Sequence, residues 1–258
     1  DSFSDGGRYL DPAAAVARGR ELLAEGADVL DLGAESTRPG SEPVAPAEQI
    51  RRLAPVLDAL RGVPDAVLSV DTSSPEVAED ALGRGAHIIN DIRALAEPGM
   101  AAVVARAGAG VVLMHMRGTP RTMQDDPRYD DVVAEVAAFL AERRAFAVAQ
   151  GIADEAIALD PGIGFGKTAT HSLALLAGTA TLAALGRPLL VGASRKSFLG
   201  RLTDDASPAD RVPASLAAAA IAAFEGARIL RVHDDAASVR VARVADATRA
   251  ARRTIARA

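Results

Sequence analysis

The sequence contains no cysteine and no tryptophan, and it has few aromatic residues of any kind. Without cysteine the chain can form neither a disulfide framework nor a thiolate metal site, which fits a reducing compartment, so we expect a cytoplasmic protein. No apolar run reaches the roughly 18 residues of a membrane span. The net charge of −5 comes without a basic stripe that would attract nucleic acid. We therefore expect neither a membrane nor a nucleic-acid partner.

Lysine and asparagine are also scarce. Of the 29 basic residues only Lys167 and Lys196 are lysines, and Asn90 is the single asparagine. Codon bias in a GC-rich genome explains the depletion itself. A lysine that persists in an arginine-rich chain nevertheless points to a site that needs a compact ammonium rather than a planar guanidinium. The two lysines are therefore candidates for functional positions.

Short apolar runs alternate with longer amphipathic segments along the whole chain. The runs are continuous rather than alternating, which is typical of parallel strands buried on both faces. They cover residues 27–33, 66–71, 87–91, 110–116, 156–162, 188–194 and 227–234. Helical patterns with start and stop signals cover 12–26, 46–60, 130–151 and 209–226. The sequence thus predicts seven strand–helix units.

A doubly wound open sheet and a closed barrel both fit seven such units. The opening stretch DSFSDGG, residues 1–7, precedes the first helical pattern and resembles a loop that leaves a strand not present in the chain. Adding that strand gives eight, the (β/α)8 barrel, also called the TIM barrel. We therefore predict one α/β domain over residues 1–258, a barrel truncated at its N-terminus, because no linker-like segment divides the chain.

Each predicted strand ends in polar side chains. In a parallel barrel all carboxyl ends of the strands share one face, and that face holds the active site. The convergence of seven polar strand ends on one mouth predicts a ligand site there. The side chains concerned are Asp31, Asp71, Asn90, Asp91, His115, Asp160, Ser194, Arg195, Lys196, Arg231 and His233.

The stretch DPGIGFGKT, residues 160–168, looks at first like a nucleotide-binding loop. That loop needs four residues between its first glycine and the Gly-Lys pair, whereas only three separate Gly162 from Gly166. The following TATHSLALL delays the expected helix. We therefore reject the ATPase interpretation. A glycine-rich turn around Phe165 would let backbone approach a flat ligand and offer one aromatic face, although a simple strand-to-helix turn stays open.

Cations surround the predicted mouth. ESTRPG, residues 35–40, offers the Thr37 hydroxyl and the forked Arg38 cation to a phosphate. SRKSFLG, residues 194–200, combines two cations with Ser197 near an expected helix start. With carboxylates from other strands, this mouth suits a ligand that has an anionic tail and a ring bearing N–H donors. By contrast, we interpret His87 and His171 as structural or surface residues, and no spacing indicates a zinc site.

Together these motifs resemble one family. DSFSDGG, DLGAESTRPGSEPV, SVDTSSPEV, HIINDIRAL, VLMHMRGTPRTMQDDPRYDDVVAEV, LDPGIGFGKT, LLVGASRKSFLG and RVHD, in this order, resemble the dihydropteroate synthases, the folate-pathway enzymes blocked by sulfonamides. The resemblance runs over essentially the whole chain. It implies a transferase that condenses 6-hydroxymethyl-7,8-dihydropterin diphosphate with p-aminobenzoate, giving 7,8-dihydropteroate and pyrophosphate.

The resemblance also implies residue roles. The pterin pocket would comprise Asp71, Asn90, Ile92, Met114, Asp160, Phe165, Gly192, Lys196 and Arg231. The diphosphate would bind Thr37, Arg38, Arg231 and His233. The p-aminobenzoate site would use Phe3, Thr37, Pro39, Phe165, Lys196 and Ser197. The catalytic set would be Lys196, Arg231, His233, Arg38 and Asp71, with loops 1–7 and 36–42 closing over the substrates.

The family pattern further implies Mg²⁺ as cofactor and a homodimer. The family's metal-contacting Asn lies upstream of Asp1, so the metal ligands in this chain remain unknown. Two other interpretations stay open. One is a pterin-binding barrel of the methyltetrahydrofolate:corrinoid methyltransferase kind, which needs no diphosphate cluster. The other is a pterin-binding homologue without catalysis.

Overall fold

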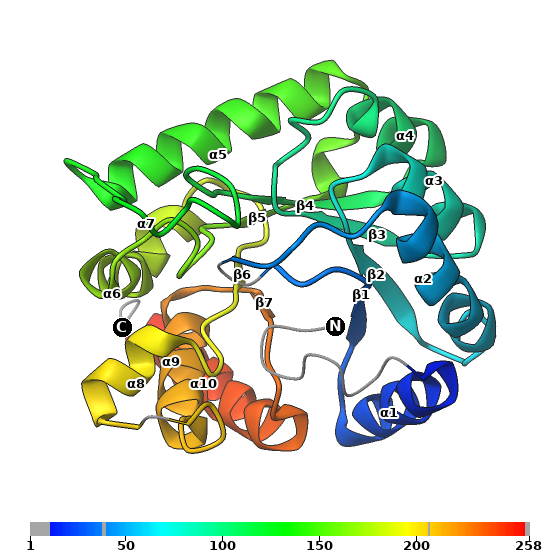
Figure 1. Cartoon of the computed structure of the whole chain (residues 1–258). Helices are drawn as coiled ribbons and strands as arrows, with labels where there is room; N and C mark the ends of the chain where they lie inside the picture. Colours follow the sequence, from blue (N-terminus) through cyan, green and yellow to red (C-terminus); the bar gives the residue numbers. More distant parts are fainter. Residues whose placement is uncertain (1–10, 38–39, 206, 256–258) are drawn as a thin grey trace.

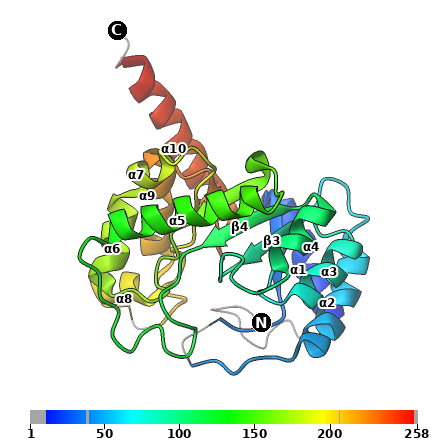
Figure 2. The same ribbon diagram turned by 90° about the horizontal axis from the view of Figure 1, so that it is seen from above.

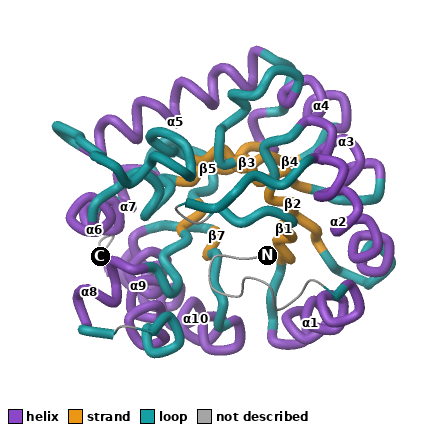
Figure 3. The backbone as a smooth tube through the Cα atoms, in the orientation of Figure 1, coloured by secondary structure: helices purple, strands orange, loops and turns teal. Residues whose placement is uncertain are grey.

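The computed structural model describes residues 11–37, 40–205 and 207–255. Seven parallel strands are present among them, in the seven predicted places: β1 (Val29–Gly33), β2 (Val67–Asp71), β3 (Ile88–Asp91), β4 (Gly110–Met114), β5 (Ile157–Asp160), β6 (Leu190–Val191) and β7 (Ile229–Leu230). Strands β1 to β5 pair in chain order, β6 pairs with β7, and a bridge between Leu159 and Leu189 joins the two sheets. The strands gather at the centre of the molecule, as Figure 3 shows.

Helices surround the strands in an outer ring, as in a (β/α)8 barrel (Figure 1). Within the described ranges the strand order leaves β1 and β7 as edges, and the strand that was predicted to be missing from the chain would lie between them. The stretch 1–7, on which that prediction rested, lies outside the described residues. The arrangement still brings the carboxyl ends of all seven strands to one face.

The helices follow the predicted pattern. They are α1 (Pro12–Glu25), α2 (Pro46–Leu60), α3 (Pro75–Gly83), α4 (Met100–Ala107), α5 (Val132–Ala149), α6 (Ala169–Ala177), α7 (Thr179–Ala183), α8 (Ser197–Thr203), α9 (Val212–Glu225) and α10 (Asp235–Ile255), with a 3-10 turn, η1, at Asp154–Ala156. Helix α1 illustrates the start and stop signals: the Asp11 carboxylate accepts the Ala14 N–H at 3.0 Å, and Gly26 ends the helix with φ 102°. Helix α10 projects from the body toward the C-terminus (Figure 2).

Alternation along the strands divides the core into two parts. Leu68, Ile89 and Leu159 point outward and are fully buried against the helices. Their neighbours Val112 and Ala158 point into the barrel and form with Leu190 a small apolar floor. Side chains two residues apart lie on the same face of a strand. The residues two positions after Val112 and Ala158 must therefore line the barrel mouth. No helix in the described ranges combines the length and the apolar character needed to cross a membrane.

Candidate active site

A cavity of about 370 Å³ opens at the carboxyl ends of the strands and extends beside α1. All nine predicted pterin-pocket residues line it, together with Thr37 and His233 from the predicted diphosphate site. They come from all seven strands or the loops that follow them. The register places Asp71 opposite Asn90 and Met114 opposite Asp160 on neighbouring strands. The barrel thus collects in one cavity residues that are up to 223 positions apart, since Pro12 and Asp235 both line it.

Arg231 crosses the mouth from the end of β7 to the far strands β1 and β2. Its Nε donates to Asp31 Oδ2 at 2.7 Å, and a terminal nitrogen donates to Asp71 Oδ2 at 3.0 Å. Burial opposes the guanidinium charge, but Asp31 and Asp71 hold the pKa of Arg231 above its ordinary value. Burial raises the pKa of Asp71, against the lowering effect of Arg231. The cation is therefore fixed over the cavity by two carboxylates.

Asp31 is the functional residue that the sequence reasoning did not assign. Its position at a strand end was noted, yet its partners come from β3 and β7. The same Oδ2 atom that accepts from Arg231 accepts from Asn90 Nδ2 at 3.1 Å. Asp31 Oδ1 and Asn90 Oδ1 are buried, and neither has a hydrogen-bond partner among the described residues. Two acceptors are thus available to N–H donors of a ligand.

Asp160, Lys196 and Phe165 line the same cavity. Asp160 Oδ1 accepts the Gly162 N–H at 2.7 Å, and burial raises the Asp160 pKa although Lys196 opposes this. Lys196 Nζ donates to the Ile163 carbonyl and lies 4.8 Å from the centre of the Phe165 ring. Burial lowers the pKa of Lys196 to about 8. A carboxylate, an ammonium and an aromatic face are thus presented together.

Phe165 belongs to a small apolar cluster at the mouth, separate from the main core. The cluster contains Ile92, Met114, Met123 and Phe165, all buried, with Met116 packed against them. Three of its members were predicted pterin contacts. Such a wall of sulfur and aromatic surface suits a flat ring.

The glycines of the 160–168 stretch have a conformational role. Gly162, Gly164 and Gly166 have φ of 62°, 84° and 63°. A Cβ atom on Gly162 would lie 1.9 Å from the carbonyl oxygen of His115. The loop after β5 therefore packs directly on the loop after β4, which only glycine permits. As expected, no helix begins at Lys167: α6 begins two residues later, at Ala169, with a capping box between Thr168 and His171.

The two lysines singled out by composition have different environments. Lys196 lines the cavity, whereas Lys167 is buried at 3% exposure and is not among the lining residues. Lys167 Nζ is 2.9 Å from His115 Nδ1 and donates to the carbonyls of His115 and Phe165 at 3.2 and 2.9 Å. Burial lowers the pKa of Lys167 well below its ordinary value and that of His115 to about 3. Lys167 therefore ties together the loops after β4 and β5.

The remaining predicted residues fall in three groups. His233 lines the cavity, and its Nδ1 is 3.0 Å from Ser194 Oγ. Ser197 begins α8 as expected, but it is exposed and is not part of the cavity lining. Phe3, Arg38 and Pro39 lie outside the described residues.

The two histidines interpreted as structural behave accordingly. His87 Nδ1 accepts the Leu68 N–H at 3.1 Å, between neighbouring strands. His171 accepts the Thr168 N–H at 3.3 Å and so completes the cap of α6. Neither lines the cavity.

The described ranges do not fit a metal site by themselves. They contain no group of three or more His, Asp or Glu side chains that could hold a metal ion. The two carboxylates nearest the cavity's cation, Asp31 and Asp71, are both paired with Arg231.

The comparisons with known proteins agree on one family. The family model described as pterin binding enzyme matches residues 1–233. The dihydropteroate synthase of Escherichia coli strain K12 is 47% identical over 252 residues, which cover 98% of this chain and 89% of that protein. The dihydropteroate synthase of Synechocystis is 43% identical, over 96% of this chain and 86% of that protein.

Solved structures give the same result. The Yersinia pestis dihydropteroate synthase in complex with a sulfonamide drug is 45% identical and superposes with a TM-score of 0.93, covering 97% of this chain and 90% of that one. The Xanthomonas albilineans dihydropteroate synthase in complex with 7,8-dihydropteroate is 44% identical with a TM-score of 0.84, covering 93% and 88%. Both the sequence and the three-dimensional arrangement are therefore shared over nearly the whole chain.

Proposed function

The chain belongs to the dihydropteroate synthases of the pterin-binding enzyme family, and from this premise we propose how its residues carry out the synthase reaction. The substrates are 6-hydroxymethyl-7,8-dihydropterin diphosphate and p-aminobenzoate, and the products are 7,8-dihydropteroate and pyrophosphate. The observation that carries the assignment of residues is the single cavity that Asp160, Lys196 and Arg231 line together. A mouth with both charge signs matches a ligand with a donor-bearing ring and an anionic tail.

The pterin ring binds in the inner part of the cavity. Asp160 accepts hydrogen bonds from the amino-pyrimidinone edge, a pairing that two parallel N–H donors favour. Asn90 and Asp31 offer the two buried acceptors that have no partner in the described ranges. The ring packs against Phe165, Met114 and Ile92, the apolar cluster at the mouth.

The diphosphate binds at Arg231 and His233, with Thr37 and Arg38 from the loop after β1. The bond between the methylene carbon and the diphosphate oxygen breaks, and its electron pair leaves with pyrophosphate. Positive charge then develops on the methylene and is delocalised into the dihydropterin, where the carboxylates of the cavity can balance it. Fixed cations stabilise the leaving group as its negative charge develops, which is the form of catalysis that preorganised dipoles and charges provide.

The second substrate closes the reaction. The amine nitrogen of p-aminobenzoate forms a bond to the methylene carbon and releases one proton, so no side-chain nucleophile is needed. Lys196 and Phe165 border this position, with Lys196 Nζ 4.8 Å from the ring centre. Ser197, at the start of α8, and Phe3 and Pro39 complete the proposed p-aminobenzoate contacts.

Of three further proposals, the metal and the homodimer rest on the family resemblance alone, and the location rests on the absence of cysteine. Mg²⁺ assists the departure of pyrophosphate, the enzyme is a homodimer, and it works in the cytoplasm. The described residues supply no metal cluster, so the metal proposal depends on ligands from the substrate or from other parts of the protein.

A stoichiometric assay tests the proposed function. Purified protein is incubated with the pterin diphosphate and p-aminobenzoate, and dihydropteroate and pyrophosphate are quantified separately. We expect one pyrophosphate for each dihydropteroate. Pyrophosphate release without dihydropteroate, or tight pterin binding with no product, would refute it and favour a pterin-binding protein without this activity.

A further inference from the structure

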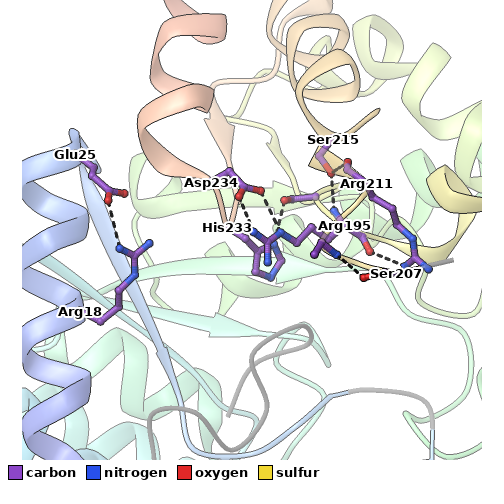
Figure 4. A network of polar contacts seen from close by, with 10 residues as sticks. Arg18, Glu25, Arg195, Ser207, Arg211, Ser215, His233 and Asp234 are labelled. Atoms are coloured by element: carbon purple, nitrogen blue, oxygen red, sulfur yellow. Dashed lines mark hydrogen bonds and ion pairs between the residues drawn. The ribbon is translucent and has the colours of Figure 1, made fainter. Parts of the chain in front are cut away.

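A bidentate ion pair joins the two loops that carry Lys196 and His233. Arg195 Nε donates to Asp234 Oδ2 at 3.1 Å, and a terminal nitrogen donates to Asp234 Oδ1 at 2.5 Å (Figure 4). The two side chains are only 18% and 20% exposed. Arg195 directly precedes Lys196, and Asp234 directly follows His233. The pair thus connects the immediate neighbours of two proposed substrate contacts across 39 residues.

The backbone at Arg195 is held in an unusual conformation. Its φ is 57°, in the left-handed region that a residue other than glycine rarely adopts. The start of α9 fixes both of its backbone polar groups: the Arg195 N–H donates to Ser215 Oγ at 2.8 Å, and Arg211 donates to the Arg195 carbonyl at 3.0 Å. Figure 4 shows these contacts around Arg195. Strain of this kind persists where the surroundings over-determine the conformation, and it is concentrated at functional sites.

A second link runs parallel to the ion pair. Ser194 Oγ is 3.0 Å from His233 Nδ1, and Ser194 is buried. Ser194 and Arg195 on one loop therefore face His233 and Asp234 on the other, in two consecutive contacts. The Ser194 contact orients the imidazole ring, while the ion pair sets the separation of the two backbones.

We propose that the Arg195–Asp234 pair is a positioning clamp that holds His233 against the loop after β6 and thereby sets the affinity for the diphosphate of the substrate. The inference rests on the proposed function, because it takes His233 as a diphosphate contact. Neither clamp residue lines the cavity, so both act through their neighbours. The clamp affects the diphosphate end of the ligand through His233. Asp160 and Lys196 have their own contacts with the loop after β5, at Gly162 and Ile163, and these stay in place.

The chain offers a matched control. Arg144 and Asp154 form the same bidentate pair, at 2.6 and 2.7 Å, with side chains 32% and 31% exposed. They join α5 to the η1 turn before β5, at the amino end of the strands and away from the mouth. Asp154→Asn therefore perturbs a comparable pair, together with the contact of Arg187 to Asp154 at 3.1 Å, without touching the site.

The experiment measures, by calorimetry, the affinity for two ligands: the pterin diphosphate and the pterin alcohol that lacks the diphosphate. The ratio of the two affinities reports the diphosphate contacts alone. In Asp234→Asn and Arg195→Lys we expect this ratio to fall by about 10-fold or more, since small misplacements of positioned groups cost up to about 100-fold. Affinity for the alcohol and the ratio in Asp154→Asn should stay at wild-type values.

The outcomes separate the inference from its premise. If Asp234→Asn and Arg195→Lys keep the wild-type ratio, with or without a lower melting temperature, the pair is merely structural and the inference is overturned. Equal losses for both ligands overturn it as well. If the wild-type protein itself binds the diphosphate no more tightly than the alcohol, the proposed diphosphate site is wrong and the clamp falls with it. Arg195→Lys keeps the experiment decisive if Asp234→Asn does not fold.

Discussion

Replacing Arg231 by methionine removes the cation that crosses the mouth while keeping much of its apolar stem. In the free protein Arg231 donates to Asp31 at 2.7 Å and to Asp71 at 3.0 Å. We expect the same two N–H donors of the guanidinium to bind the diphosphate oxygens. A hydrogen bond to a charged group contributes about 1.5–3 kcal/mol, so two of them contribute about 3–6 kcal/mol.

Solvent reduces this figure. The Arg231 side chain is 39% exposed, so the lower end of the range applies. A loss of about 3 kcal/mol corresponds to a drop of about 150-fold in kcat/KM, since about 1.4 kcal/mol is tenfold. Loss of one preorganised donor elsewhere costs a similar factor of about 100 to 1000.

The assay follows dihydropteroate formation under conditions where kcat/KM is obtained for the pterin diphosphate, with affinity for the pterin alcohol measured beside it. We expect the loss to fall on the diphosphate substrate and the alcohol to bind nearly as before. A variant within about threefold of wild type in kcat/KM would refute the reasoning. Such a result would be that of a pterin-binding methyltransferase-like protein, which has no diphosphate to hold.

The same substitution has a consequence for stability. Burial already raises the pKa of Asp71 above its ordinary value, against the effect of Arg231. Without Arg231 this pKa rises further, so the unfolded chain loses the proton at lower pH than the folded chain. The free energy of unfolding therefore falls as pH rises from the pKa of Asp71 in the unfolded chain to its pKa in the folded protein. Denaturant unfolding should show Arg231→Met more destabilised relative to wild type at pH 8 than at pH 5, and an equal difference at both would contradict the burial argument.

Three further predictions concern other parts of the site. Gly162→Ala places a Cβ 1.9 Å from the His115 carbonyl oxygen in a backbone with φ 62°, so the free energy of unfolding should fall by more than about 1 kcal/mol in thermal unfolding. Gly62→Ala, with open space around it, should leave the free energy of unfolding unchanged. Equal effects of the two substitutions would contradict the packing of the two loops. Burial lowers the pKa of Lys196 to about 8, and its charged form predominates only below that pH. We therefore expect kcat/KM to decline above about pH 8. A flat profile up to about pH 9.5, roughly one and a half pH units above that pKa, would show that the charge of Lys196 is not needed. Chelation with EDTA should abolish turnover and added Mg²⁺ should restore it, and full activity in EDTA would remove the proposed metal.

The strands were predictable because their apolar runs are continuous and regularly spaced. Seven runs became seven parallel strands, and the side-chain alternation then carried Asp71, Asn90 and Asp160 to the inside of the mouth. Helix starts were less predictable where the capping residue is unusual. Histidine at the third position of α6 completes a capping box that is normally closed by Glu or Gln, so the sequence pattern did not fix the start of this helix at Ala169.

The fate of an individual polar residue depended on contacts that the sequence does not display. Lys167 and Lys196 carried the same compositional signal, yet one is buried between two loops and the other lines the cavity. Asp31 was recognised as a strand end only, because its partners Asn90 and Arg231 lie 59 and 200 residues away. The Arg195–Asp234 pair was likewise invisible, since two charged residues become partners only when the barrel brings their loops together.

A crystal structure of the protein with the pterin diphosphate bound tests the central claim most directly. The account predicts the ring edge within hydrogen-bond distance of the Asp160 carboxylate and the diphosphate oxygens within hydrogen-bond distance of Arg231 and His233. A ring bound elsewhere, or a diphosphate turned away from Arg231 toward solvent, would contradict it.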